Sequence, residues 1–409
     1  MRGFITIILL LFFQHSYSRE IRVGKTCSVH RIAEALRMAE TGDTVTVTSG
    51  LYREGNLVIS RKIVLRGWQN PILDGENKYE ILSVKAGGVI IDGFTIINSG
   101  VSSLEDISGI KVYDQKNVII RNNHLKDNFF GIFLQNSSAC IIQNNRIAAM
   151  KSDEQSSGNG IHCWKCDSIQ VIGNEVSGQR DGIYFEFVTN SVIWRNQSVN
   201  NIRYGLHFMF SHNDAYISNV FTNNGAGVSV MFTHGVKMYS NIFENNWGDG
   251  SYGLLLKEIS DSYIEGNRFL ANTSGIYMEG ASRIVMRKNV FKNNGWGLKI
   301  QASCLKVEVT ENNFIGNSFD IGTNGTLVLN SFNHNYWDKY EGYDLNKDQI
   351  GDIPYRPVSM YSMIVEKNPP AMLLFRSFMT TLLDKTEKIL PALTPEGLKD
   401  NRPAIKKIF

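Results

Sequence analysis

The chain has 409 residues, with 42 Lys and Arg against 39 Asp and Glu, so its formal net charge is only +3. This balance excludes a protein that tracks nucleic-acid phosphates, and a hydrophobic fraction of 43% with 20% charged residues excludes a disordered chain. Glycine is frequent, at 36 residues against 8 prolines, and Asn recurs through the middle of the chain, so we expect many turns between short strands.

Residues 1–18 have the features of a secretory signal peptide. Arg2 provides a positive start, residues 4–13 form an apolar run, and Ser16 and Ser18 supply small side chains before a cleavage site. As a helix this run would span roughly half of a bilayer core, which argues against an uncleaved anchor. We therefore expect the mature chain to be soluble outside the cytoplasm. Its five cysteines are an odd number, so at least one is unpaired and a disulfide scaffold is not expected.

The first segment of the mature chain predicts a short helix. In residues 28–40, Ala33 and Leu36 have helical spacing, and Ser28 is placed to cap the N-terminus. Strand-like residues follow from Thr44. Such a helix would close one end of the fold that the next residues predict.

A repeat of 22 to 23 residues governs the region that follows, and with its flanks it predicts one domain over residues 19–325. Two series of positions show the repeat: an Asn within an apolar pattern, and a Gly before an aliphatic residue. The intervals between members of both series become longer at the same two places, which indicates two insertions. The Asn series is Asn123, Asn145, Asn174, Asn196, Asn219, Asn241, Asn267, Asn289 and Asn312, and the Gly series is Gly109, Gly131, Gly160, Gly182, Gly205, Gly227, Gly253, Gly275 and Gly297. Each unit alternates apolar and polar residues and cannot bury its apolar face alone. We therefore predict an all-β fold, a right-handed parallel β-helix with Asn side chains stacked from coil to coil.

The Gly series also predicts which side chains face outward. Positions one and three residues after each Gly are apolar, as in Ile183 and Phe185, so the second and fourth positions face out. The fourth position holds Met209 and Met231 in consecutive coils, which lie about 4.8 Å apart. His207 is at a second position, and His212 and His234 share a later column. Thioethers and imidazoles so placed suit Cu(I). The alternatives are that the methionines fill the core, that the His and Met residues share the surface by accident, or that they contact a partner.

Other chemical motifs in these coils favour structure over catalysis. The pair Cys163 and Cys166 has CxxC spacing, but Cys163 is at an inward position, which favours a buried thiol or a local disulfide. Outward charges such as Glu186, Lys257 and Glu279 are scattered, so we find no catalytic constellation and expect no enzyme. The alternative function is a secreted polysaccharide-modifying enzyme or a carbohydrate-binding β-helix.

Beyond residue 325 the repeat fails, and two further segments are predicted. Residues 326–368 form an irregular segment with an acidic loop. In this loop Asp344, Asn346, Asp348 and Asp352 are spaced as calcium ligands, although Gln349 and Tyr355 replace the expected Gly and Glu and an Asx-rich turn is the alternative. Residues 369–409 form a tail with an amphipathic helical stretch at 371–390.

The chain resembles the NosD family over nearly its full length. The resemblance rests on the signal peptide, the repeats, the segment Gly205 to Ser211 with its His-x-Met, Met231, residues 253–257, and the tail 335–344 with 351–355. It implies a periplasmic accessory protein that docks, peripheral to the membrane, on an ABC transporter permease with its ATPase. It further implies that copper passes from a copper chaperone lipoprotein to nitrous oxide reductase, with no nucleic acid involved.

The resemblance and the residue patterns together predict two sites. His207, Met209, His212, Met231 and His234 would bind copper transiently as Cu(I). The tail would present an apolar face to the permease, although a helix lying over the open end of the β-helix fits the same pattern. The residues of this face are Met372, Leu373, Phe375, Phe378, Met379, Leu382 and Leu383.

Overall fold

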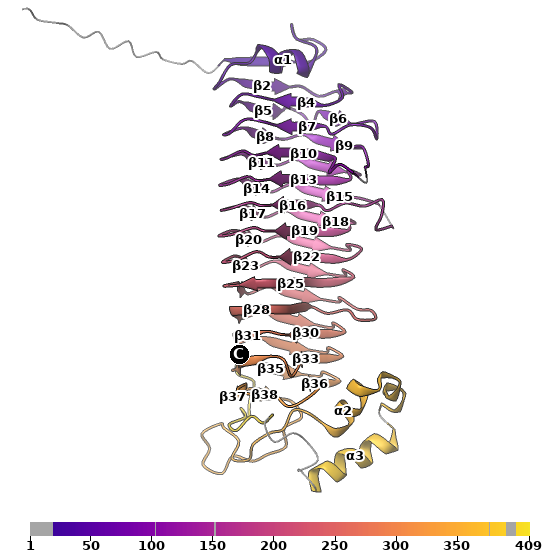
Figure 1. Cartoon of the computed structure of the whole chain (residues 1–409), viewed down its shortest axis with the longest axis vertical. Coiled ribbons are helices and arrows are strands. Elements are labelled where there is room, and N and C mark those ends of the chain that lie inside the picture. The colour runs from indigo at the N-terminus through magenta and orange to yellow at the C-terminus, as the bar shows by residue number, and fades with distance from the viewer. Residues whose placement is uncertain (1–18, 103, 151–152, 376, 390–397) are drawn as a thin grey trace, which may run out of the picture.

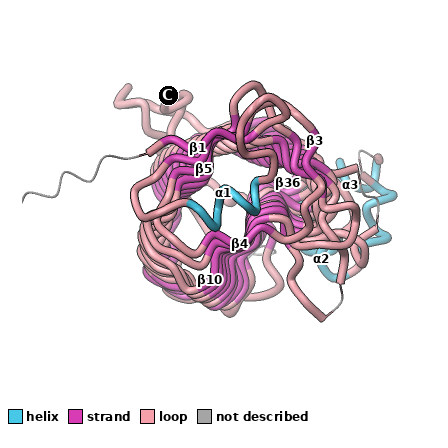
Figure 2. The backbone as a smooth tube through the Cα atoms, turned by 90° about the horizontal axis from the view of Figure 1, so that it is seen from above, coloured by secondary structure: helices cyan, strands magenta, loops and turns pink. Residues whose placement is uncertain are grey.

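The computed structural model describes residues 19–102, 104–150, 153–375, 377–389 and 398–409, and the predicted signal peptide lies outside them. The described chain winds as a right-handed parallel β-helix, as predicted from the repeat (Figure 1). Every strand pair within the two sheets is parallel and in register, so each coil stacks directly on the one before. Three walls result, which the view along the axis shows enclosing the core (Figure 2).

The first wall carries the outward columns in which the copper ligands were predicted. Its strands are β4 (Leu57–Ile59), β7 (Leu82–Val84), β10 (Ser108–Tyr113), β13 (Phe130–Gln135), β16 (Ile161–Trp164), β19 (Asp181–Glu186), β22 (Tyr204–Met209), β25 (Ala226–His234), β28 (Leu254–Glu265), β30 (Ser274–Glu279), β33 (Trp296–Ile300) and β36 (Phe319–Gly322). Strands β25 and β28 run on around the corner into the second wall.

The second wall follows the first in each coil. Its strands are β1 (Glu20–Val23), β2 (Thr44–Val47), β5 (Val64–Gly67), β8 (Ile90–Asp92), β11 (Ile119–Arg121), β14 (Ile141–Gln143), β17 (Gln170–Ile172), β20 (Val192–Trp194), β23 (Ala215–Ile217), β26 (Lys237–Tyr239), β31 (Ser282–Arg287), β34 (Leu305–Thr310) and β37 (Ser331–Asn333).

The third wall is a separate sheet of short strands. They are β3 (Leu51–Tyr52), β6 (Ile72–Asp74), β9 (Thr95–Ile97), β12 (His124–Lys126), β15 (Arg146–Ala148), β18 (Glu175–Ser177), β21 (Gln197–Val199), β24 (Val220–Thr222), β27 (Ile242–Glu244), β29 (Arg268–Leu270), β32 (Val290–Lys292), β35 (Asn313–Ile315) and β38 (Tyr336–Trp337). Because β37 and β38 still pair with the coil before them, the stack continues past residue 325, where the repeat ceases to be visible in the sequence.

The interior is held by ladders of identical side chains. Phe243, Phe269 and Phe291 stack with ring centroids 4.7 and 4.9 Å apart and are fully buried. The predicted Asn ladder is also present: the amide of Asn219 donates to Asn241 at 3.0 Å, and this bond recurs from coil to coil. Each ladder Asn also donates to a backbone carbonyl, so these fully buried amides satisfy polar groups that the turns would leave unpaired.

A short helix crosses the N-terminal end of the stack, as the sequence predicted. Helix α1 (Ile32–Met38) buries Ile32 and Leu36 against the core (Figure 2). The prediction that Ser28 caps this helix is wrong, because the N-cap residue is Arg31 and has no capping side chain. Instead the carboxylate of Glu54, from the next coil, accepts the backbone N–H groups of Ile32 and Ala33 at 2.8 and 3.0 Å. The cap therefore comes from a neighbour in space.

The C-terminal helices lie beside the stack and not over its open end (Figures 1 and 2). They are α2 (Met360–Lys367), within the segment predicted as irregular, the 3-10 helix η1 (Pro369–Leu374) and α3 (Phe378–Ile389). Tyr361 and Val365 of α2 pack on Trp296 and Phe319 at the outer face of the first wall. The end of the core is covered instead by other residues, among them Val358 and Leu398. The interpretation that the stretch 371–390 lies over the core is therefore wrong.

Candidate metal centre and neighbouring surfaces

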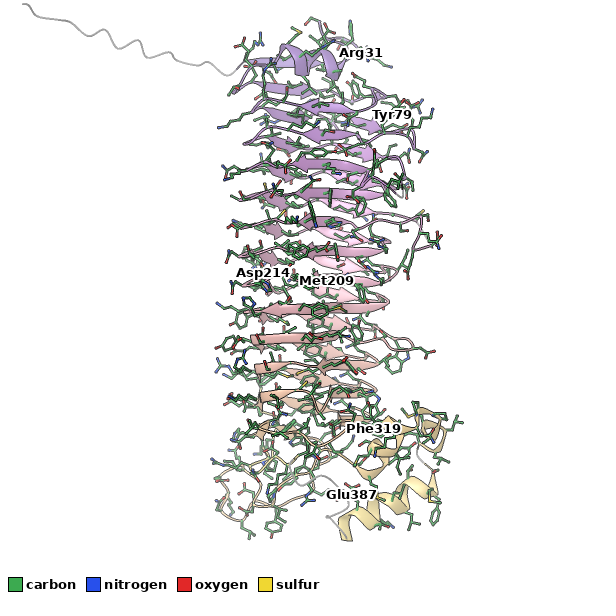
Figure 3. All side chains as sticks on the ribbon, viewed as in Figure 1. Arg31, Tyr79, Met209, Asp214, Phe319 and Glu387 are labelled. Carbon is green, nitrogen blue, oxygen red and sulfur yellow. The ribbon has the colours of Figure 1, made fainter. Side chains whose placement is uncertain are left out.

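The two methionines predicted as ligands are direct neighbours on the first wall. Met209 at the end of β22 pairs in register with Met231 of β25, and both side chains face outward and are half-buried. The column continues to Glu186 on one side and Lys257 on the other. The hydroxyl of Tyr184 donates a hydrogen bond to the sulfur of Met209 at 3.7 Å, which steadies that side chain (Figure 3 labels Met209). The predicted register is therefore confirmed.

The two histidines of the later column are also stacked as predicted. The rings of His212 and His234 lie 3.9 Å apart with an angle of 18° between their planes. The backbone N–H of His234 donates to Nδ1 of His212, so the neutral ring of His212 carries its proton on Nε2. Burial, together with the nearby His234, lowers the pKa of His212 and favours this neutral form. Since lone pairs lie in the ring planes, the rings must tilt before both can point at one ion.

A bend in the backbone lies between the methionine pair and the histidine pair. Phe210 and Phe232 have left-handed backbones, with φ of 48° and 55°, and each follows its methionine directly. The ring of Phe210 stacks between those of Phe232 and Phe187, at centroid distances of 5.0 and 5.2 Å. A left-handed conformation is costly for a bulky residue, and in most other coils a polar residue or Gly takes this corner. The methionine pair and the histidine pair are each present in the structure. A single metal centre that uses ligands from both pairs stays a prediction.

His207 is on the same wall but is buried among side chains of neighbouring coils. It is 7% exposed, and its ring lies 4.7 Å from Tyr184 and 4.8 Å from Tyr204. Its Nδ1 lies 3.4 Å from the carboxylate of Asp181, which favours a proton on Nδ1 and a lone pair on Nε2. Among the described residues Nε2 has no hydrogen-bond partner. Carboxylate support of this kind orients imidazole ligands in metal sites.

The sequence reasoning missed Asp181 and Arg203, which set the charge around His207. Asp181 is fully buried and accepts two hydrogen bonds from Arg203, at 2.9 and 2.6 Å. Burial alone would raise the pKa of Asp181, but the bonds from Arg203 and His207 outweigh it and lower the pKa. A signal existed, because Asp181 and Tyr204 are aligned in consecutive coils and Arg203 precedes Tyr204.

The cysteines of the CxxC pair face the interior, and neither lies on the candidate metal surface. Cys163 and Cys166 are 0% and 3% exposed, and all five cysteines are free thiols. Burial raises the pKa of Cys163 well above its usual value, so its thiol stays protonated and unreactive.

The oxygen atoms of the acidic loop are used in local turns. Asp344 accepts the backbone N–H groups of Asp348 and Gln349, and Asp352 accepts that of Leu345. Asn346 and Asp348 accept further backbone N–H groups within the loop. Within the described part of the chain, no three His, Cys, Asp or Glu side chains are grouped to hold a metal. These bonds are those of the Asx-rich turn, and calcium binding stays a prediction.

Most apolar residues of the C-terminal stretch are exposed on one protruding surface. We call it the C-terminal apolar surface, and it comprises Met372, Leu373, Leu374, Phe375, Phe378, Met379 and Leu382. Leu373 and Phe378 are 91% and 81% exposed, whereas the predicted contact residue Leu383 packs partly against the body of the protein. None of the described helices has the length and hydropathy needed to span a bilayer.

Comparison with known proteins finds two family models that match parts of the chain, and two relatives. A family model described as "Periplasmic copper-binding protein (NosD)" matches residues 148–344, and one described as "Right handed beta helix region" matches residues 41–157. A "Probable ABC transporter binding protein NosD" of Pseudomonas aeruginosa is 28% identical over 382 residues, covering 88% of each chain. Its namesake from Stutzerimonas stutzeri is 25% identical over 376 residues, covering 86% of this chain and 85% of that one.

Solved structures match the fold at much lower identity. The A-module of the mannuronan C-5 epimerase AlgE4 from Azotobacter vinelandii has a TM-score of 0.53 and 16% identity, covering 73% of this chain and 88% of that one. A GH87 α-1,3-glucanase from Streptomyces thermodiastaticus has a TM-score of 0.59 and 13% identity, and the match covers 75% of this chain and 65% of that one. These likenesses establish the β-helix alone. The two relatives match over almost the whole length of this chain, and the family model spans the methionine and histidine columns, so the chain is similar to proteins of the NosD family.

Proposed function

We propose that this protein is a periplasmic, non-enzymatic carrier that binds Cu(I) and relays it, together with an ABC transporter, for assembly of the copper sites of nitrous oxide reductase. The observation that carries the proposal is the in-register pair of Met209 and Met231 on the outer wall, one bend away from the stacked His212 and His234. The description of the family as periplasmic and copper-binding, and the names of its relatives, support it. Residues 1–18 would direct the export.

The chemistry of these side chains suits a relay better than a permanent site. Thioether sulfur is a soft, uncharged ligand that prefers Cu(I) to harder divalent ions. Coil spacing places the two methionine backbones about 4.8 Å apart, so their flexible side chains can converge on one ion. The imidazoles need a tilt before they bind together. A site completed only by such movement holds its ion weakly and releases it to a better ligand set.

A Cu(I) titration against a competing chelator tests the ligand assignment. The variant Met209→Leu with Met231→Leu keeps the volume of both side chains and removes both sulfurs, so we expect Cu(I) affinity to fall on the order of tenfold or more. The matched control is Met38→Leu with Met150→Leu, which removes two sulfurs that are exposed elsewhere on the surface. Equal affinity of the two double variants would refute the assignment.

We further propose that the C-terminal apolar surface docks on the permease. Leu373 and Phe378 are too exposed to stabilise the fold, and exposed apolar patches of this kind mark interaction sites. The names of the relatives as ABC transporter binding proteins support this partner. A copper chaperone lipoprotein and the reductase would bind to coils of the β-helix that the permease does not cover.

Point substitutions test the docking more cleanly than truncation does. Deleting the chain after Pro369 would also remove Leu398 and Asp400, which close the end of the core. In contrast, Leu373→Asp with Phe378→Asp should abolish co-purification with the permease and leave the circular dichroism spectrum unchanged. The control is Leu329→Asp with Leu345→Asp, two residues 70% and 77% exposed outside this surface. Retained co-purification of the first pair would refute the docking site.

The alternative of a polysaccharide-modifying enzyme has less support from the first wall. Asp181, a carboxylate buried there at the middle coils, is bound by Arg203 and His207 and is not poised as a free acid or base. Release of unsaturated or reducing ends from uronate polymers by the purified protein would favour the enzyme instead.

A further inference from the structure

A groove lies at the N-terminal end of the stack, opposite the end that carries the C-terminal helices (Figure 1; Figure 3 labels Arg31). It has a volume of about 390 Å³, within the roughly 300–1,000 Å³ of small-molecule sites. Helix α1 borders it on one side, and β4 with the turn that follows borders it on the other. Its lining residues, of which three are arginines and none is acidic, are Arg31, Ala33, Leu36, Arg37, Asn56, Leu57, Val58, Ser60 and Arg61.

The groove runs along α1, because its lining residues come from both ends of this helix. Arg31 directly precedes the first turn, and Arg37 lies in the last turn. At a rise of 1.5 Å per residue the two are about 9 Å apart along the helix axis. The groove is therefore longer than a single inorganic ion, and it has room for an organic group beside a charged one.

One of the three arginines is fixed at the C-terminal end of α1. The Nη1 group of Arg61 donates to the backbone carbonyls of Arg37 and Ala39, at 3.1 and 2.8 Å. A guanidinium group has five N–H donors on three nitrogens, and these bonds use only one nitrogen. Among the described residues, Nε and Nη2 of Arg61 have no hydrogen-bond partner, so their N–H groups remain for a ligand.

The groove has an excess of two positive charges. The carboxylate of Glu54, which caps α1, lies 3.6 Å from Nε of Arg31 and offsets that charge. Within the part of the chain that the structure describes, Arg37 and Arg61 form no ion pair. The surroundings are also positive, because residues 19–66 contain nine Lys and Arg against five Asp and Glu, while the whole chain has a net charge of only +3.

These properties select an organic ligand with a doubly charged anionic group. A carboxylate has a single charge and would leave one guanidinium group without a counter-ion. A phosphate monoester has a charge of about −1.5 to −2 at pH 7 and three terminal oxygens that accept N–H groups. Guanidinium groups bind phosphate oxygens through two parallel N–H donors. Val58, which is 41% exposed, offers an apolar contact to the organic group of the ester.

We propose that this groove binds a phosphate monoester. The phosphate group lies between Arg37 and Arg61, and the organic group extends along α1 over Val58 toward Arg31. A soluble ester and the headgroup of phosphatidic acid share this chemistry, and the experiment below distinguishes the two sources. The groove is remote from the methionine and histidine columns, so the proposal does not depend on copper binding.

Calorimetric titration of the full chain with phenyl phosphate, at about 0.15 M salt to screen non-specific attraction, tests the proposal. We expect a dissociation constant of about 1 mM or tighter. Benzoate has the same ring with a single charge and should bind about tenfold more weakly, and inorganic phosphate, which has no ring, should bind several-fold more weakly. Co-sedimentation with phosphatidylcholine vesicles only when they contain phosphatidic acid would identify the lipid as the source. Binding of phenyl phosphate without co-sedimentation would identify a soluble ester.

Single substitutions locate the site. Among the described residues the Arg37 side chain has no ion pair or hydrogen bond, so Arg37→Gln should preserve the fold and weaken phenyl phosphate binding about tenfold. The matched control is Arg268→Gln, which removes an exposed arginine from β29 of the third wall. A second variant, Val58→Asp, places a carboxylate at an exposed position in the groove and should abolish binding with an unchanged circular dichroism spectrum.

Three results would each overturn the proposal. They are the absence of binding heat with phenyl phosphate at about 20 mM, an affinity for benzoate equal to that for phenyl phosphate, and equal weakening by Arg37→Gln and Arg268→Gln. Cu(I) affinity should stay unchanged in all of these variants, so the outcome is separate from that of the copper titration.

Discussion

The buried ion pair beside His207 offers a sharp test of how the first wall is stabilised. In the native protein Asp181 accepts two short hydrogen bonds from Arg203 and lies 3.4 Å from His207. Asp181→Asn keeps the shape and removes the charge, so Arg203 loses its counter-ion and His207 loses a charged acceptor. Removing one partner of a buried pair costs roughly 3–5 kcal/mol. Because the Arg203 side chain is 34% exposed and can be hydrated, we expect the lower end, about 3 kcal/mol.

The chain contains a matched control in the pair of Asp261 and Arg283. It has the same 22-residue spacing and hydrogen bonds of 2.6 and 2.7 Å, but both side chains are 53% exposed. Solvent screens such a pair, so Asp261→Asn should leave stability nearly unchanged. Urea unfolding followed by far-UV circular dichroism compares the two variants. Equal losses of stability in the two variants would refute the argument that burial, and not hydrogen-bond geometry, decides how much an Asp–Arg pair contributes to the free energy of unfolding.

The same pair predicts a dependence on pH. The pKa of Asp181 is lower in the folded protein than its ordinary value of 3.8. Its contribution is therefore fully present above that ordinary value and is lost as the pH falls through the lower folded value. The difference in stability between the native protein and Asp181→Asn should close on acidification. A difference that stayed constant down to about pH 2 would contradict this origin.

The register of the coils was predictable because packing fixes it. Side chains alternate with a period of two along a strand, so a shift by one residue would expose Ile183 and Phe185. Two independent series, of Asn and of Gly, then located the insertions and aligned Met209 with Met231 and His212 with His234. The structure confirms both pairs.

The relation between the two pairs was not predictable in the same way. It depends on the direction of the backbone at Phe210 and Phe232, and nothing in a Phe side chain indicates a left-handed conformation. The burial of His207 likewise depends on Tyr184 and Tyr204, which belong to the adjoining and the same strand. The period of the repeat predicts which column a residue occupies, but it does not predict how far the neighbouring side chains cover that residue.

The C-terminal tail shows the limit of an amphipathic pattern. An apolar stripe in residues 371–390 fits equally well with a cap on the core and with a docking surface. Residues near the C-terminus cover the core instead. Asp400 takes the place of the next Asn in the ladder and accepts a hydrogen bond from the side-chain amide of Asn335 at 3.0 Å. With Leu398 and Val358 also covering the core, the stripe is left on the surface.

Three further predictions follow from buried groups of the coil stack. Phe269→Ala removes the middle ring of a buried stack and should cost about 3–5 kcal/mol in urea unfolding, whereas a loss below 1 kcal/mol would show that the ladder does not stabilise the coils. Asp400→Ala leaves the backbone N–H groups of His334 and Asn335 unpaired, so hydrogen exchange should accelerate in β37 and β38 while the first coils stay protected; uniform exchange would contradict a local role. Asp214, labelled in Figure 3, has a pKa raised to about 8 because it is buried, and its second carboxylate oxygen has no partner among the described residues. Folding must therefore protonate a group that is ionised in the unfolded chain, so native stability falls as the pH rises from about 4 to about 8. Asp214→Asn cannot ionise and keeps the acceptor for the N–H of Ser191, so its advantage over the native protein should be absent near pH 4 and reach about 4 kcal/mol near pH 7. Parallel stability curves for the two proteins across this range would show that Asp214 is not protonated in the folded state.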